Sequence, residues 1–183
     1  MSQAKEKLTL DGFNVLDQAH PAAHEFIRGE ARARVQPGRV HTDVVMNLIG
    51  ALLGALRGTP VRVYGDSLRV QVGEEAILYP DISVTSDPDD MKGRTLKSPS
   101  LIVEVLSQQS QNFDRGPKFA AYRKLPGLLE YVMVDPETQW VELFRRSPEG
   151  AWTLHDVTED TLLLASVGTE LSMNDIFGNL GSD

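Results

Sequence analysis

Two acidic residues interrupt runs of apolar residues that are otherwise typical of buried strands. Asp81 follows Pro80 in the segment 77–85, and Glu104 lies in the middle of the segment 101–106. Burying a carboxylate costs free energy unless a cation or hydrogen bonds compensate its charge. If the two segments pair, the carboxylates converge on one oxygen-ligated cation, for which Mg²⁺ or Mn²⁺ is preferred. Such an ion polarises a phosphoryl oxygen and lowers the pKa of a bound water.

Lys118 is the third candidate catalytic residue. It lies in the first turn of a predicted second helix, and Tyr122 follows four residues later on the same helix face. A lysine beside a metal-bound water can position that water or offset the negative charge that develops on phosphorus. Taken alone, Lys118 is an ordinary solvated helix residue and Tyr122 an ordinary core residue, so their interpretation depends on the acidic pair.

Further candidates precede the acidic pair in the chain. Glu30, or less favourably Glu25, lies ahead of the first long helix and could supply another metal ligand, although a surface acid is an equally good interpretation. His41 opens that helix and could orient a ligand or contact a phosphate at the helix N-terminus. The slightly favoured alternative for His41 is a cap or a structural hydrogen-bonding group.

A sheet is needed to bring these separate segments together. Apolar residues recur at helical spacing through 40–57, which predicts a long amphipathic helix. Pro80 removes a ladder donor, so the strand around Asp81 is predicted to be interrupted or at an edge, with its end facing a cleft. A second helix is predicted over 117–124, with Asp114 as its capping residue.

Short strands dominate the rest of the chain, after a short helix expected within 11–23. The order of elements predicts an α/β or α+β core with a mixed sheet. Strands are predicted at 31–35, 61–64, 68–72, 77–85, 101–107, 130–134, 140–145 and 152–157, followed by a short apolar run at 162–164 and a turn at 174–177.

Length and composition are those of an ordinary globular protein. The chain is expected to form a single domain over 1–183, large enough to bury a core without disulfides. The absence of cysteine excludes disulfides, cysteine-ligated zinc and a thiol nucleophile. The first residues lack the apolar core of a secretory signal, and the longest apolar run, 48–56, is too short to span a bilayer. A cytoplasmic protein without a membrane partner is expected.

The net charge of −8 at first argues against nucleic acid, because phosphate binding draws on Lys and Arg. The acidic excess is concentrated in residues 147–183, which hold seven Asp or Glu and no Lys or Arg. The other 146 residues hold 19 acidic and 18 basic residues, so the part with the candidate site is nearly neutral. No G-x-S-x-G elbow, P-loop or dinucleotide-binding glycine pattern is present.

A series of motifs follows in a characteristic order. They are Glu25–Glu30, His41, Tyr64–Val70, Tyr79–Val84, Leu101–Ser107, Asp114–Lys118 with Tyr122, and Leu129–Pro136. Together they resemble the Uma2 family of endonucleases, which is grouped with the PD-(D/E)XK restriction endonuclease-like nucleases. The resemblance covers roughly residues 10 to 180.

This resemblance implies a restriction endonuclease-like core, a central mixed sheet flanked by helices, with a Mg²⁺ site at Asp81 and Glu104. The parent motif places a lysine two residues after the second acid, where this chain has Leu106. In this family the lysine is matched on the following helix, which makes Lys118 its equivalent.

The leading hypothesis is a Mg²⁺- or Mn²⁺-dependent endodeoxyribonuclease in which Asp81 and Glu104 hold the ion and Lys118 assists. Two alternatives stay open: a catalytically inactive module that binds nucleic acid or protein, and a metal-dependent hydrolase of a smaller phosphoester. DNA is the expected partner. A homodimer is also expected, because cutting both strands of a duplex commonly uses two sites related by symmetry.

Overall fold

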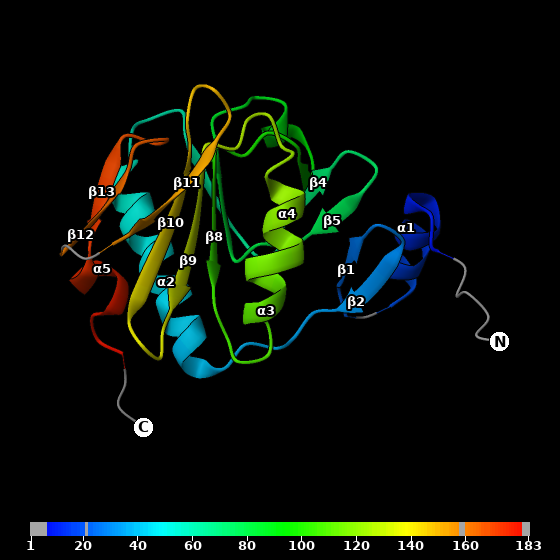
Figure 1. The fold of residues 1–183 in the computed structure, drawn as a ribbon, viewed down its shortest axis with the longest axis horizontal. Helices are drawn as coiled ribbons and strands as arrows, with labels where there is room; N and C mark the ends of the chain where they lie inside the picture. The colour runs from blue at the N-terminus through cyan, green and yellow to red at the C-terminus, as the bar shows by residue number, and fades with distance from the viewer. Residues whose placement is uncertain (1–6, 21, 158–159, 181–183) are drawn as a thin grey trace.

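The computed structural model describes residues 7–20, 22–157 and 160–180. A six-stranded sheet forms its centre (Figure 1). Neighbouring strands run antiparallel except β8 and β9, which are parallel, so the sheet is mixed, as predicted. In spatial order the strands are β11 (Trp152–Asp156), β10 (Trp140–Arg146), β9 (Glu130–Asp135), β8 (Leu101–Val105), β6 (Ile82–Thr85) and β3 (Arg62–Gly65).

Different elements cover the two faces of this sheet. The long helix α2 (Arg39–Ala55) packs on one face through Val44, Leu48 and Leu52, which recur every fourth residue and are buried. The same core includes residues of β12 (Thr161–Leu164), β13 (Thr169–Ser172) and α5 (Met173–Phe177). A helical segment covers the opposite face; it consists of α3 (Gln111–Phe113), η2 (Asp114–Lys118) and α4 (Phe119–Tyr122).

A second sheet contributes to the core beneath this helical segment. It has five strands, and Val70, Val72 and Leu78 pack in the same cluster as Tyr122. In spatial order the strands are β2 (Glu30–Ala33), β1 (His24–Ile27), β5 (Ala76–Leu78), β4 (Arg69–Val72) and β7 (Thr95–Leu96); α1 (Leu10–Ala19) packs against β1, and η1 (Asp90–Lys92) precedes β7.

The predicted strand over 77–85 is in fact two strands that belong to different sheets. β5 ends at Leu78, and β6 begins at Ile82. Pro80 lies between them and cannot donate to a ladder, so the chain leaves one sheet and enters the other at this point. The predicted interruption is confirmed, and Asp81 lies at the junction of the two sheets.

The second helix begins earlier than predicted. It starts at Gln111, and Asp114 is a buried residue within it rather than its cap. Pro117 resembled a helix start, because proline is tolerated in a first turn, where its missing N–H is not needed. Here η2 is a π-helical turn, and its wider ring accommodates the proline inside the helix.

Several short elements also differ from the sequence prediction. β1 was not predicted, because it has only four residues and Glu25 breaks its apolar pattern. β13 was missed as well, and the predicted turn at 174–177 is part of α5, which begins with a capping box between Ser172 and Asp175. Within the described ranges, no helix is both long enough and apolar enough to cross a membrane.

Candidate active site

Asp81 and Glu104 face each other across two paired strands. β6 and β8 run antiparallel with Ile82 opposite Val103, and this register places Asp81 opposite Glu104. Oδ2 of Asp81 accepts a hydrogen bond of 2.7 Å from the backbone N–H of Val105, which ties the carboxylate to β8. Strand pairing thus brings the two acids to one place.

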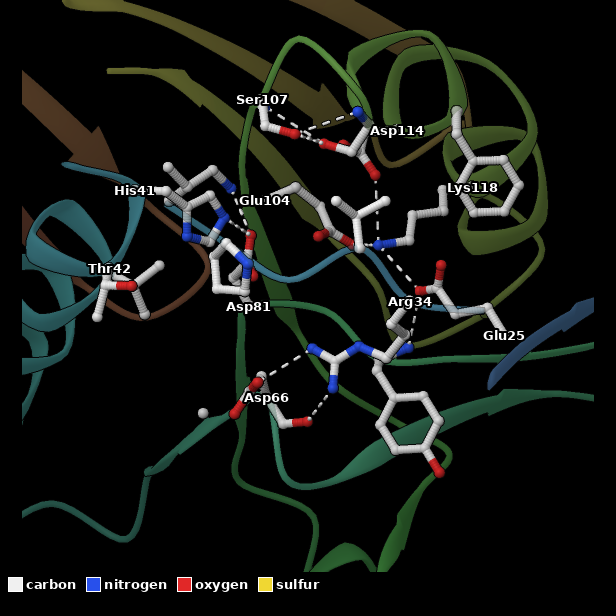
Figure 2. A pocket seen from close by; sticks show the side chains of 18 of the residues that line it. Glu25, Arg34, His41, Thr42, Asp66, Asp81, Glu104, Ser107, Asp114 and Lys118 are labelled. Carbon is white, nitrogen blue, oxygen red and sulfur yellow. Dashed lines mark hydrogen bonds and ion pairs between the residues drawn. The ribbon is translucent and has the colours of Figure 1, made fainter. Parts of the chain in front are cut away.

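Lys118 reaches the same place from the helical segment. Its Nζ lies 3.0 Å from Oε1 of Glu104, 3.0 Å from Oε1 of Glu25 and 3.3 Å from Oδ1 of Asp114 (Figure 2). Side chains alternate along a strand, so Leu106 shares the face of Glu104, and its side chain packs in the core under the helical segment. A lysine on this helix can therefore reach the acid that a lysine at position 106 would serve.

The π turn helps to set the position of Lys118 on this helix. Within it, the N–H of Phe119 donates to the carbonyl of Asp114, five residues earlier, and Tyr131 Oη donates to the same carbonyl at 3.1 Å. The wider turn changes the angle at which later side chains leave the helix axis. Single π turns occur frequently at functional sites for this reason.

Glu25, and not the favoured Glu30, is the acid of the first hairpin that reaches this cluster. Glu30 is exposed at the start of β2, opposite Ile27. Glu25 is 6% exposed, and its Oε1 accepts a hydrogen bond of 3.2 Å from the backbone N–H of Tyr79. The hairpin turn carries Glu30 away from the junction of the sheets. The predicted preference for Glu30 over Glu25 is therefore corrected.

The two remaining candidates each contact one of the paired acids. Tyr122 is fully buried, and its Oη donates to Oε1 of Glu104 at 3.2 Å. His41, near the start of α2, places Nε2 3.3 Å from Oδ2 of Asp81. Nδ1 of His41 is buried and has no hydrogen-bond partner among the residues that the structure describes.

The cluster holds more negative than positive charge. Four acids, Glu25, Asp81, Glu104 and Asp114, lie around the single ammonium of Lys118. Burial raises the pKa of the Glu104 carboxyl well above its ordinary value; Lys118 opposes this rise, and the neighbouring carboxylates strengthen it. Burial by itself lowers the pKa of Lys118, but the carboxylates, Glu104 foremost, reverse the effect and raise it. A further cation would be stabilised here.

The donor set fits a divalent cation whose coordination is completed by water and substrate. In the described part of the chain, no three His, Asp or Glu side chains already form a metal-holding group. Glu25 and Asp114 contact Lys118, whereas Oδ1 of Asp81 and Oε2 of Glu104 accept no hydrogen bond from any described residue. Mg²⁺ is commonly held by one or two carboxylates together with waters and phosphate oxygens.

All of these acids line one pocket of about 240 Å³. Segments from several parts of the chain form its walls: the strand and loop 32–37, the first half of α2, and the segment 104–118. Arg32 and Arg34 belong to this lining. Beyond His41 and Thr42, the α2 side of the pocket is apolar. A charged region and an apolar wall therefore share one cavity.

Sequence reasoning missed Asp114 as a member of the cluster and ranked Glu25 as a less favourable candidate ligand than Glu30. Asp114 was assigned to a helix cap, although its spacing of four residues from Lys118 is also the spacing of a helical ion pair. Arg32 and Arg34 were noted only as basic residues. Their alternate positions on a short strand were a signal that both point to the same side.

Comparisons with known proteins identify the family to which the chain is similar. The family model Uma2, described as "Putative restriction endonuclease", matches residues 10–174. The chain is 28% identical over 177 residues to the uncharacterized protein slr1290 of Synechocystis, covering 95% of this chain and 93% of that protein. It is 29% identical over 137 residues to the uncharacterized protein sll1609 of the same organism, covering 73% of this chain and 77% of that protein.

A solved structure has a similar fold. It is the crystal structure of a "putative nuclease belonging to DUF820" from Anabaena variabilis, with a TM-score of 0.74, 21% sequence identity, and coverage of 93% of this chain and 97% of that chain. The family resemblance inferred from the sequence motifs is thereby confirmed. The chain belongs to the Uma2 family.

Proposed function

We propose that this protein is a metal-dependent nuclease that hydrolyses phosphodiester bonds of DNA. One observation carries the proposal: Asp81, one residue before β6, stands opposite Glu104 on the paired strand β8, with the Lys118 ammonium 3.0 Å from Glu104. Membership of a family described as restriction endonucleases supports a nuclease-like role. The choice of Mg²⁺ or Mn²⁺ rests on the oxygen donors of the two carboxylates.

Asp81 and Glu104 would hold the ion, since each has one oxygen, Oδ1 and Oε2 respectively, that accepts no hydrogen bond from described residues. When bound, the ion supplies a Lewis acid for a phosphoryl oxygen and a water of lowered pKa. Val105 fixes Asp81, and Lys118 with Tyr122 fixes Glu104, so both acids are oriented before substrate arrives. Such preorganisation lowers the energetic cost of reorganising the site during the reaction.

Lys118 would stabilise the negative charge that develops on the phosphoryl group. Because its pKa is raised by the surrounding carboxylates, the lysine acts as a fixed positive charge and not as a proton acceptor. Glu25 and Asp114 hold the ammonium beside Glu104, which gives these two acids a positioning role.

The test is Asp81→Asn, which retains an oxygen that can accept the Val105 hydrogen bond but removes the charge. We expect Mg²⁺ to raise the melting temperature of the wild-type protein and not that of the variant, because only the former binds the ion. Cleavage of oligonucleotides should fall about 100-fold or more. Asp89→Asn is the matched control, since the Asp89 side chain is 85% exposed outside the pocket. Unchanged metal binding and cleavage in Asp81→Asn would refute the proposal.

A second candidate is a non-catalytic module that binds nucleic acid or protein. It is favoured by the position of Lys118, whose ammonium already lies within 3.0 Å of both Glu25 and Glu104 and so neutralises part of their charge. In that case Mg²⁺ would change neither the melting temperature nor DNA binding. Metal-dependent hydrolysis of a small phosphodiester without cleavage of any oligonucleotide would instead identify the third alternative, a small-phosphoester hydrolase.

A further inference from the structure

We propose that the nucleic-acid strand is unpaired where this protein acts on it, and that one base of the strand lies against the apolar wall of the pocket. This inference rests on the proposed nuclease function and names the substrate class of the same site. Three features of the pocket carry it: the depth of the acids, the composition of the α2 wall and the position of two arginines.

The acids of the cluster are almost fully buried. Glu104 is 2% exposed and Lys118 is 6% exposed, and the Asp81 side chain is 14% exposed. The pocket around them is about 240 Å³, whereas sites for drug-sized ligands are roughly 300–1,000 Å³. A duplex carries its phosphates on the outside of a wide, stiff cylinder, which cannot enter a cavity of this size. An unpaired strand is narrow and flexible, so it can bring one nucleotide to the mouth of the pocket.

The wall formed by α2 and the preceding loop has the chemistry of a base-binding surface. Pro37, Val45, Met46 and Ile49 line it, next to the cluster of acids. Met46 is 60% exposed, although it belongs to a helix whose opposite face is fully buried. The apolar part of this wall, beyond His41 and Thr42, offers nothing to a phosphate, but the apolar face of a base packs well on it. Enzymes that act on unstacked nucleotides enclose the base between apolar and aromatic side chains in this way.

Two arginines provide positive charge for the strand that continues out of the pocket. The Arg32 guanidinium lies 4.5 Å from the centre of the Phe113 ring. Arg34 lies 3.0 Å from Oδ2 of Asp66, which offsets part of its charge until a phosphate competes for the guanidinium (Figure 2). Both residues are on or next to β2 and line the same pocket as Asp81 and His41. A positively charged border with an adjacent apolar surface is the pattern expected for single-stranded nucleic acid.

Binding experiments test the inference without relying on cleavage. The full chain, with Ca²⁺ and separately with chelator, is titrated against a labelled single strand, its duplex, and an abasic oligomer of the same length, and binding is followed by fluorescence anisotropy. We expect the single strand to bind about tenfold more tightly than the duplex and about tenfold more tightly than the abasic oligomer. Equal binding of duplex and single strand would overturn the inference.

A pair of variants links the base to the α2 wall. Met46→Gln keeps the size of the side chain and adds polarity, and we expect it to weaken binding of the single strand about fivefold. It should leave binding of the abasic oligomer unchanged. Leu53→Gln is the matched control, because Leu53 lies on the same helix, is 53% exposed and does not line the pocket. If Met46→Gln weakens binding of both oligomers equally, the wall does not hold a base.

Cleavage assays on the same substrates separate this inference from the proposed function. Metal-dependent cleavage of duplex and single strand at equal rates would leave the nuclease intact and overturn the substrate class. Preferential binding of the single strand without any cleavage would support the base-binding wall and refute the nuclease. Failure to bind or cleave any of the oligomers would refute both.

Discussion

Lys118 is the residue on which the charge balance of the pocket depends. Its ammonium contacts Glu25, Glu104 and Asp114, and all four residues are nearly excluded from solvent. Removing one partner of a buried ion pair is costly because the remaining charges stay buried without compensation. The same cluster can therefore be tested by a stability measurement as well as by an activity measurement.

Lys118→Met removes the charge and keeps an unbranched apolar chain. We expect the free energy of unfolding, measured in chelator by denaturant titration, to fall by about 3–5 kcal/mol. Mg²⁺ should stabilise the variant more than the wild-type protein, because the carboxylates then lack a counter-charge. Cleavage should fall about 10²- to 10³-fold.

Lys124→Met is the control for Lys118→Met, since Lys124 lies just after the same helical segment, is 42% exposed and pairs with Glu75. Stability and cleavage close to wild type are expected for it. A Lys118→Met protein that cleaves at the wild-type rate would exclude the lysine from the reaction.

At the scale of elements, another buried acid has a structural role that is separate from the pocket. Glu130, at the start of β9, is 1% exposed and accepts hydrogen bonds from Arg145, Ala165 and Ser166. These contacts hold the turn between β12 and β13 against the central sheet. Glu130 pairs with Leu101 at the start of β8, whereas Glu104 lies near the end of that strand.

Glu130→Gln should therefore lower stability and spare the pocket. Replacing one oxygen by an NH₂ group sets a donor against another donor, so we expect a loss of about 2–3 kcal/mol in the free energy of unfolding. The Mg²⁺-induced rise in melting temperature should persist. Glu170→Gln, on the exposed side of β13, serves as the control, with an expected change within about 0.5 kcal/mol. Loss of Mg²⁺ binding in Glu130→Gln would contradict this separation.

At the scale of the whole molecule, net charge limits how this protein can bind nucleic acid. A chain of net charge −8 has little general attraction for phosphate, so binding must depend on local positive groups. Arg32 and Arg34 are such groups in the pocket. The expected affinity therefore depends only weakly on salt, in contrast to proteins that cover many phosphates of a duplex.

The salt dependence of single-strand binding gives a number that can be checked. Two phosphate contacts predict a slope of about −1.4 in a plot of log K against log salt concentration, and Arg32→Gln should reduce its magnitude by about 0.7. Arg94→Gln, an exposed arginine outside the pocket lining, should leave the slope unchanged. A steep slope that is insensitive to Arg32→Gln would indicate that the strand binds elsewhere.

Oligomeric state belongs to the same scale. The homodimer predicted from the sequence was tied to cutting both strands of a duplex. If the substrate is unpaired, a single site is sufficient, and we expect the cleavage rate per chain to be independent of protein concentration. A rate per chain that rises with concentration, together with a dimeric mass in sedimentation, would favour the original prediction.

Local sequence pattern predicted the parts of this site that depend on short-range structure. Apolar runs interrupted by Asp81 and Glu104 predicted two strands with inward-facing acids, and Pro80 predicted the break between β5 and β6. Lys118 was identified by family resemblance, as a lysine on the following helix. These features follow from short-range periodicity and backbone restrictions, which are visible within a few residues.

The distant groups that complete the cluster became visible in the folded structure. Glu25 meets Tyr79 and Lys118 because β1 pairs with β5, and no local pattern encodes that pairing. Asp114 was predicted to be a helix cap, but in the structure it is a buried residue of the π turn. The geometry of a helix around proline depends on what packs against it. The pocket depth and its apolar wall arise likewise from the packing of α2, β2 and the helical segment.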